Sequence, residues 1–396
     1  YNEGRSENKG GEPEGITFDR FGPRDVLFVG AERANVIGVY DLTDPTSPEF
    51  VQVLPTGSGP EGFETIPSRG LLAVSAENSE DGFPSLITLY SGDRRNVADY
   101  PQLVSVDEPA GTPLPWVAMS GLAGTPDNPN TIYGVSDSFL ADGFIFTIDV
   151  SGDRGEITDR TRVTDPNNLA APLEFFPDLE GIAVAPEGGF WLASEGRKSG
   201  GVVVRDNALI KTDDSGVVEH YITLPDDLVA GATNSGFEGI AVTESGGETE
   251  FVYAVVQREW NAGDNGVLGD PDNLVKIARW DVENEEWAFV HYEKAPPAVS
   301  GWVGLSEITL LPDGTFAIIE RDNQLGTDAV FKQVWQIDLA SAPFSTDLTS
   351  PLAVLEKDTD QILLADLLDV LHENSIWVPD KLEGLSVSGA NGTVHI

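Results

Sequence analysis

The sequence predicts an all-β fold, a β-propeller of seven four-stranded blades, with six blades as the alternative. A hairpin pattern of apolar strand, turn and apolar strand recurs along the chain in six steps of about 60 residues. Between these hairpins lie segments with apolar residues at every second position, so each repeat supplies about four strands, the content of a blade. No composition break divides the 396 residues. We therefore expect a single propeller domain over residues 1–396.

Each repeat opens with a similar short motif. The copies are PEGITF from Pro13, PEGFETIPSRGLLAVSAE at 60–77, SGLAGTPDNPNTIYGVSDS at 120–138, DLEGIAVAPEGGFWLASEGR at 178–197, GFEGIAVTESGGETEFVYAVVQRE at 236–259, LSEITLLPDGTFAIIERDNQ at 305–324 and KLEGLSVSGANGTVHI from Lys381. The third copy lacks the leading glutamate, and the last copy has only its first hairpin. Either strands from the N-terminal end complete the last blade, or the chain is incomplete at its ends.

One segment departs from the strand pattern. DQILLADLLDVLHEN at 360–374 places leucines at helical spacing after Asp360, a candidate N-cap. We predict a short helix inserted in a connection there, with a packing role and no chemistry.

Composition excludes several classes of function. The chain has no Cys and only four His, which form no HxH or HExxH pair, so thiolate catalysis and histidine-metal chemistry are not expected. Lys plus Arg number 23 against 66 Asp plus Glu, a net charge of −43 that repels nucleic acid and anionic membranes. The chain contains no apolar run of 18 residues, so direct insertion into a membrane is not expected. Such acidity suits a salty medium or a calcium-binding protein.

The composition also indicates where the protein works. The chain starts at Tyr1 without an initiator Met and shows no signal peptide, which is typical of a processed, secreted product or a trimmed fragment. With 42 Gly, 26 Pro and one Met, it fits an extracellular β-protein. We predict an extracellular or cell-surface location, with the periplasm as an alternative. Attachment to a cell surface or matrix would use segments outside the given chain.

Acidic residues frame most of the hairpins. In an antiparallel hairpin the residue before the first strand lies near the residue after the second, so we expect Glu180 near Glu195 and Glu307 near Glu320. If these hairpins form the inner strands of the blades, the acids surround one mouth of the central channel, where like charges raise one another's pKa and cations must compensate. Ca²⁺ fits because carboxylates are its ligands and it tolerates irregular coordination. The expected metal ligands are Glu14, Glu61, Glu180, Glu238, Glu307 and Glu383.

Each predicted metal ligand has a structural alternative. A glutamate before a tight glycine can accept hydrogen bonds from backbone amides of the neighbouring blade and so hold two blades together. The loop NAGDNGVLGDPDN at 261–273 could hold a peripheral calcium through Asp264, Asp270 and Asp272, and a solvated turn is its alternative. No GxSxG elbow occurs, so serine-esterase chemistry is not expected.

Several of these motifs resemble known families. The openings LEGIAV, FEGIAV and LEGLSV, with the closings SEGR and ERDN, resemble the esterase-like phytase domain. The N-terminal EPEGITF, VGAERANVIGVYDLTDPTSPEFVQ and PEGFETIPSRGLLAVSAE resemble the secreted choice-of-anchor I proteins. Together the two resemblances cover nearly the whole chain. They imply a secreted β-propeller with calcium-assisted phosphoesterase or related esterase activity.

The charged residues at the ends of the hairpin motifs suggest how such an enzyme would act. We predict a metal-dependent phosphoric ester hydrolase whose small anionic phosphoester substrate is gripped by Arg197, Arg258 or Arg321. Glu195 or Glu320 would orient a metal-activated water for attack, without a protein nucleophile. The alternative is a non-catalytic calcium-binding surface or matrix propeller, a scaffold or binding platform, because the sequence offers no evident nucleophile or His base.

Overall fold

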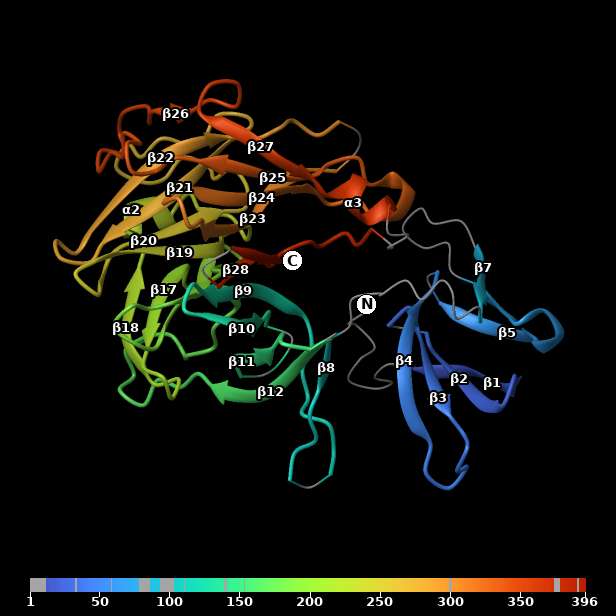
Figure 1. Cartoon of the computed structure of the whole chain (residues 1–396). Helices are drawn as coiled ribbons and strands as arrows, with labels where there is room; N and C mark the ends of the chain where they lie inside the picture. The colour runs from blue at the N-terminus through green and yellow to red at the C-terminus, as the bar shows by residue number, and fades with distance from the viewer. Residues whose placement is uncertain are drawn as a thin grey trace. The chain divides into compact units, whose positions relative to one another are not determined.

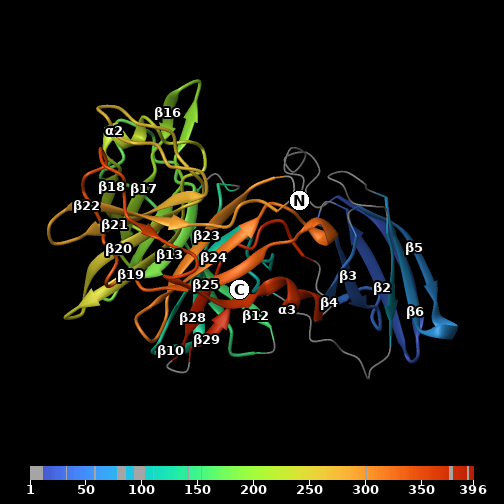
Figure 2. The same ribbon diagram turned by 90° about the horizontal axis from the view of Figure 1, so that it is seen from above.

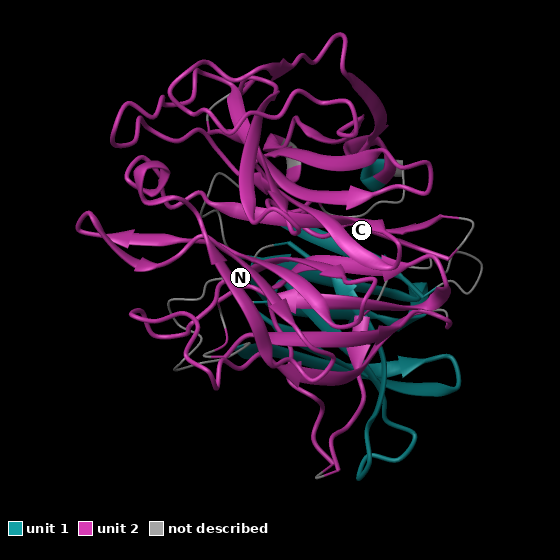
Figure 3. Cartoon of the chain, turned by 90° about the vertical axis from the view of Figure 1, so that its left-hand side faces the viewer, with its two compact units in different colours: residues 1–102, 371–377 teal, residues 103–370, 378–396 magenta. Residues whose placement is uncertain are grey.

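The chain is almost entirely β-structure (Figure 1, Figure 2). The computed structural model describes residues 12–396 except 33, 58, 78–85, 93–102, 110, 139, 141, 153, 299–300, 374–377 and 390–391. These residues form small sheets whose strands pair mostly with their neighbours in sequence, the arrangement of propeller blades. The all-β prediction is confirmed. Two compact units are present, residues 1–102 with 371–377 and residues 103–370 with 378–396 (Figure 3).

The first unit contains two antiparallel sheets. The sheets are β1 (Pro13–Phe21), β2 (Arg24–Ala31), β3 (Val36–Asp41) and β4 (Glu49–Pro55), and β5 (Pro60–Ile66), β6 (Leu71–Ala76) and β7 (Leu86–Ser91). Strands β1 and β5 lie against each other, and the ring of Phe63 fills the space where Gly15 and Gly30 carry no side chain. Buried residues such as Phe28, Ile37 and Val74 form the core of this unit.

The second unit contains five main sheets. In chain order they are β8 (Leu103–Ser105) with β9 (Met119–Thr125), β10 (Asn128–Ser136), β11 (Phe144–Asp149) and β12 (Gly155–Arg162); β13 (Leu179–Val184), β14 (Phe190–Ser194), β17 (Ala208–Thr212) and β18 (Val218–Thr223); β19 (Phe237–Ser245), β20 (Glu248–Val256), β21 (Leu274–Asp281), β22 (Glu286–Glu293) and β26 (Val354–Leu355); β23 (Val303–Leu310), β24 (Phe316–Asp322), β25 (Lys332–Ile337) and β27 (Gln361–Asp366); and β28 (Ser386–Ser388) with β29 (Thr393–His395). Between β14 and β17, the hairpin of β15 (Arg197–Ser199) and β16 (Val202–Arg205) extends away from the sheets (Figure 2).

The inner strands of the second unit form a closed ring. Strand β9 contacts β13, β13 contacts β19, β19 contacts β23, β23 contacts β28, and β28 contacts β9. Glycines permit this close packing: a Cβ on Gly181 would lie 2.5 Å from the carbonyl oxygen of Glu238, and one on Gly121 would lie 2.7 Å from the Cα of Gly181. All seven predicted hairpins are present in the chain. The number of blades and the single domain over residues 1–396 stay predictions.

The helix predicted at 360–374 starts later than expected. Residues Gln361–Asp366 form strand β27, and only Leu367–Glu373 form helix α3. Residues 361–366 pair with the edge of strand β25, and this pairing outweighs the helix that the spacing of the leucines favours. The helix begins after Asp366, whose Oδ1 accepts a hydrogen bond from the Leu368 amide at 3.1 Å. The first half of the helix prediction is therefore wrong.

Candidate functional site

A β-bulge lies at the opening motif in six of the hairpins. The strand register shifts at this point, so one residue is left unpaired and its side chain is re-aimed. The bulge lies at Glu14, Glu61, Glu180 and Ser306 in four copies, at Glu238 and Gly239 in the fifth, and at Ser120 and Gly121 in the sixth. The glutamate of the repeated motif therefore has a conformational reason to differ from the alternating strand residues around it.

Three carboxylates meet at one end of the inner-strand ring in the second unit. Asp137 follows β10, Asp178 precedes β13, and Glu180 is the bulge residue of β13. Each offers an oxygen within 4.8 Å of the other two. Asp178 and Glu180 are buried, and Asp137 is half-buried. Of the three, sequence analysis predicted only Glu180 as a metal ligand. Asp178 could have been found, because the residue two before Glu180 on an extended chain lies on the same side.

Arg205 compensates the charge of Asp178. Its Nη2 forms a buried ion pair with Asp178 Oδ2, and its Nε donates a hydrogen bond to the carbonyl oxygen of Glu195 at 2.8 Å. The amide of Ser138 donates to Asp178 Oδ1 at 2.7 Å. Burial raises the pKa of Asp178, and the guanidinium of Arg205 opposes this shift. Sequence analysis missed Arg205 and chose Arg197, its register partner in the same hairpin, which is exposed.

Burial also raises the pKa of Glu180 and Glu195. The pKa of Glu180 lies well above its ordinary value because of burial and the charges of Asp178 and Asp137, although Ser120 Oγ donates a hydrogen bond to Oε2 at 2.6 Å. Burial raises the pKa of Glu195 to about 7, against the hydrogen bond at 2.9 Å from the Gly236 amide to Oε1. A carboxyl group with a pKa near neutrality can both accept and release a proton at physiological pH.

Glu307 differs from the other predicted ligands. It follows the bulge residue Ser306 and stands where the other copies have glycine, so its side chain enters the middle of the ring beside Gly239. Its Oε1 accepts a hydrogen bond from the Ile308 amide at 2.8 Å, and Oε2 is buried without a hydrogen bond of ordinary geometry. Burial raises its pKa, while nearby backbone amides of β9, β19 and the segment before β28 favour the charged form. This geometry fits the structural alternative, in which the glutamate links neighbouring blades.

Glu238 and Glu383 lie at the same end of the ring. Glu238 is fully buried, and its Oε1 accepts a hydrogen bond from Gln257 Nε2 at 2.6 Å. Burial, followed by the charges of Glu180 and Glu195, raises its pKa well above the ordinary value. Glu383 Oε1 pairs with Arg321 Nη2 at 2.9 Å. Burial and mutual repulsion therefore oppose the charged form of Glu238, and Arg321 compensates the charge of Glu383.

Lysine and arginine side chains border these acids. Lys381 Nζ lies 3.5 Å from Glu383 and 3.6 Å from Asp137, and its side chain is 55% exposed. Although burial lowers it, the surrounding carboxylates raise the pKa of Lys381 overall. The guanidinium groups of Arg258 and Arg321 lie 4.7 and 5.3 Å from the ring centroid of Trp302, a stacked arrangement.

The two predicted arginines beside Trp302 differ in burial and in the hydrogen bonds that they make. Arg321 is buried, and its Nε donates a hydrogen bond to Ser306 Oγ at 2.8 Å, in addition to the pair with Glu383. Arg258 is half-buried and donates to Ser235 Oγ from Nε and Nη2 at 2.9 and 2.6 Å. Within the described part of the chain, the Nη1 donors of Arg258 have no hydrogen-bond partner.

Glu320 lies apart from this group of acids. The register places it opposite Leu305 on the core face of the sheet, while Glu307 pairs with Ile319 across the bulge. The Glu320 side chain is fully buried and bound by Tyr292 Oη at 2.9 Å and Lys357 Nζ at 2.6 Å. The carboxylate of Glu320 is therefore held by its own partners. The acids of this hairpin also stand differently from the bulge, because Glu307 follows the bulge residue, whereas Glu180 is the bulge residue of its own hairpin.

Glu14 and Glu61 belong to the first unit. Glu14 forms a group with Glu12 and Glu32 whose oxygens lie within 4.8 Å of one another. Desolvation and the charges of Glu77 and Glu14 raise the pKa of Glu61. The predicted ring of six metal-binding glutamates therefore stays a prediction, with its members divided between the two units.

Solved structures of low sequence identity are similar to the chain along its length. Hydrazine synthase from Kuenenia stuttgartiensis is 13% identical with a TM-score of 0.37, covering 97% of this chain and 95% of that one. Saccharomyces cerevisiae Sqt1 is 11% identical with a TM-score of 0.31, covering 87% of both chains. The β-propeller domain of Cps50 (Swd1) from Myceliophteria thermophila is 10% identical with a TM-score of 0.30, covering 86% and 89%. No curated protein matches the sequence.

Family models match both parts of the chain. The choice-of-anchor I domain matches residues 1–45. The model described as "Phytase-like: Esterase-like activity of phytase" matches residues 114–396, which include the carboxylates of the second unit. Both resemblances drawn from the sequence motifs are confirmed. Because the second match spans well over half of the 396 residues, the chain belongs to the phytase-like family.

Proposed function

We propose that the protein is an extracellular, calcium-dependent hydrolase of small anionic phosphoesters. Membership of the phytase-like family indicates a propeller-type hydrolase with esterase-like activity. The observation that carries the finer proposal is the convergence of Asp137, Asp178 and Glu180 within 4.8 Å, next to Glu195. We call these four residues the carboxylate site.

The donor atoms of the carboxylate site suit calcium. All are carboxylate oxygens, which Ca²⁺ prefers, and Ca²⁺ tolerates the irregular coordination that three converging segments provide. Asp178 accepts bonds from Ser138 and Arg205, and its carboxylate still has lone pairs left for an ion. Buried carboxylates need a partner when charged, and a divalent cation would favour the charged form of Glu180. Asp137, Asp178 and Glu180 would hold the ion.

The other side chains of the site have roles that follow from their environment. Bound calcium supplies charge compensation for an anionic substrate and lowers the pKa of a water ligand. Glu195, with its pKa of about 7, would accept the proton of the attacking water. Lys381 and Arg258 keep donors for phosphoryl oxygens, since Lys381 is more than half exposed and Arg258 has unused Nη1 donors. Arg321 and Glu320 are committed to internal pairs and are left out of this mechanism.

The extracellular location rests on different observations. The N-terminal match is to a choice-of-anchor domain, and the net charge of −43 suits a salty medium. Among the described residues, no helix is both long and apolar enough to cross a bilayer. The location is tested by following the natural protein in cell fractions and culture medium.

A second function is supported by the cations of the protein itself. Arg205, Arg321 and Lys381 already compensate Asp178, Glu383 and their neighbours, so the ring could be a rigid platform whose acids need no catalytic partner. In that case the protein would be a non-catalytic calcium-binding surface or matrix propeller.

Turnover measurements separate the two functions. Purified protein would be assayed on p-nitrophenyl phosphate and on phytate, with calcium or with a chelator. We expect calcium-dependent hydrolysis that Asp178→Asn weakens by raising the calcium requirement, and that Glu195→Gln slows by roughly 10²–10⁴-fold through loss of the general base. Asp264→Asn, in an exposed loop, is the matched control. Absence of calcium-dependent turnover on both substrates would refute the hydrolase and favour the platform.

A further inference from the structure

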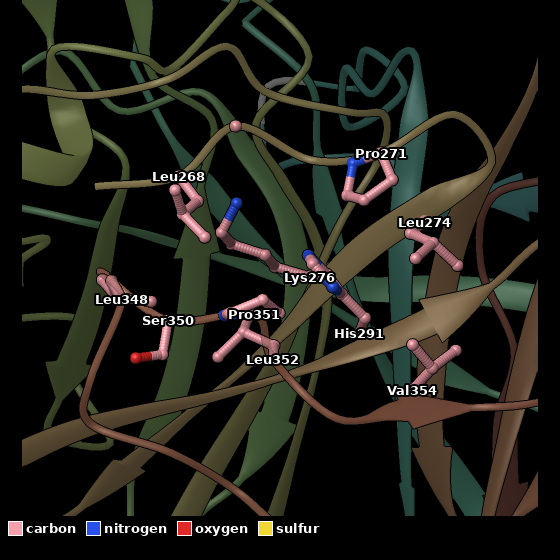
Figure 4. A pocket seen from close by; sticks show the side chains of 11 residues that line it. Leu268, Pro271, Leu274, Lys276, His291, Leu348, Ser350, Pro351, Leu352 and Val354 are labelled. Atoms are coloured by element: carbon pink, nitrogen blue, oxygen red, sulfur yellow. The ribbon is translucent and has the colours of Figure 1, made fainter. Parts of the chain in front are cut away.

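A pocket of about 220 Å³ lies at the outer part of the third sheet of the second unit (Figure 4). It shares no residue with the carboxylate site. Its walls come from the loop before β21, the loop before β26, and strands β21, β22 and β26. Apolar side chains form most of the lining, among them Leu268, Leu274, Leu348, Leu352 and Val354.

Buried polar side chains underlie one side of this pocket. Lys276 and His291 line it, with 2% and 8% of their side chains exposed. Behind them, Asp270 Oδ1 accepts hydrogen bonds from Lys276 Nζ and from His291 Nε2, the latter at 2.8 Å, and Oδ2 accepts one from the Trp260 amide at 2.8 Å. The opposite charges of Lys276 and Asp270 cancel, so this ion pair carries no net charge. The side chain of Asp270 is buried here, whereas Asp264 and Asp272 are exposed, and the peripheral calcium of this loop stays a prediction.

Lys276 and His291 each keep hydrogen-bonding capacity beyond their bonds to Asp270. His291 Nε2 is hydrogen-bonded to the carboxylate of Asp270, and the other ring nitrogen, Nδ1, has no partner among the described residues. Lys276 Nζ has three donors and a hydrogen bond to Asp270 alone within the described chain. A hydroxyl group both donates and accepts, so it can pair with a ring nitrogen and with an ammonium group of the pocket wall.

The size of the pocket limits the apolar part of a ligand. A cavity of about 150 Å³ lined by apolar residues accommodates benzene. A volume of about 220 Å³ accommodates a six-membered ring with one or two small substituents. An anionic ligand is disfavoured, since the ion pair of Lys276 and Asp270 has no net charge and the whole chain carries −43.

We propose that this pocket binds a small, uncharged molecule with an apolar ring and one hydroxyl group, such as a phenol. The ring would lie among the leucines of the two loops, and the hydroxyl group would donate to His291 and accept from Lys276. This site would work independently of the carboxylate site and of the proposed hydrolase activity.

Calorimetric titration of the full chain with p-cresol tests the proposal, with toluene and p-toluate as matched ligands. We expect saturable binding of p-cresol, at least tenfold weaker binding of toluene, which lacks the hydroxyl group, and at least tenfold weaker binding of the anion p-toluate. No binding of p-cresol at millimolar concentration would overturn the site. Equal affinity for toluene would overturn the role of His291 and Lys276. These comparisons use the wild-type protein, so they do not depend on the folding of a variant.

A pair of leucine variants locates the binding. Leu348→Trp, in the loop before β26, fills the pocket and should weaken p-cresol binding at least tenfold. Leu364→Trp, on the exposed side of β27 with 46% of the residue accessible, is the control and should leave binding unchanged. Undiminished p-cresol binding by a folded Leu348→Trp variant would place the ligand elsewhere and overturn the proposal.

Discussion

Replacement of Arg205 by alanine should destabilise the second unit strongly. The ion pair with Asp178 is buried, with 11% and 6% of the two side chains exposed. Removing one partner of a buried pair leaves the other charge uncompensated, at a cost of about 3–5 kcal/mol. Asp137 and Glu180 beside Asp178 add repulsion, so we expect a value in that range. The positive charge of the Arg205 guanidinium repels a calcium ion at this site. Calcium should therefore stabilise Arg205→Ala more than the wild type.

Urea denaturation followed by Trp fluorescence measures this prediction. Calcium present at about one hundred times its dissociation constant should return about 2.7 kcal/mol to the variant. Arg197→Ala is the matched control, since Arg197 is the exposed register partner on the same hairpin and should change the free energy of unfolding by less than about 0.5 kcal/mol. A loss below about 1 kcal/mol for Arg205→Ala, or equal stabilisation of variant and wild type by calcium, would refute the reasoning.

The remaining predictions concern the ring and its proton chemistry. Glu307→Ala should lower the free energy of unfolding by about 2–4 kcal/mol in urea denaturation, because it empties the centre of the ring, and should leave calcium affinity unchanged in calorimetry; loss of calcium binding would make it a ligand instead. Gly181→Ala should cost at least about 1–3 kcal/mol by the same method, since its Cβ meets the carbonyl of Glu238, and a neutral effect would contradict the tight ring. Burial raises the pKa of Glu195 from 4.5 to about 7, so its contribution to the free energy of unfolding is greatest below pH 4.5 and falls by about 3 kcal/mol as the pH rises to 7. Over the same pH range kcat/KM should rise, because the ionised carboxylate is the base. A pH profile of kcat/KM that is unchanged in Glu195→Gln would exclude Glu195 as the base.

The hairpins could be predicted because their signals are local. Alternating apolar residues and Gly-rich turns specify each two-stranded unit, and all seven are present. The glutamate before glycine was also recognisable as unusual, and Glu180 and Glu238 lie close enough for the charge of Glu180 to raise the pKa of Glu238. The helix predicted at 360–374 is wrong in its first half, because residues 361–366 pair with β25, which lies about 30 residues earlier in the chain.

The composition of the site depended on register, which the sequence does not state. Glu307 stands one residue after the bulge, where the other copies have glycine, and its side chain lies beside Gly239, while Glu320 is paired with Leu305 and buried. Arg205, and not its register partner Arg197, pairs with Asp178, although both belong to the hairpin of β15 and β16. A shift of one residue exchanges the two faces of a strand, so spacing between motifs could name the acids but not their partners.

The location of bound calcium tests the central claim most directly. A crystal structure of the full chain grown with calcium, with the ion identified by anomalous scattering, would show it bound by oxygens of Asp137, Asp178 and Glu180 if the carboxylate site is the working centre. Wild-type crystals at saturating calcium with no ion at these three residues, or with ions only at exposed acids elsewhere, would contradict the account.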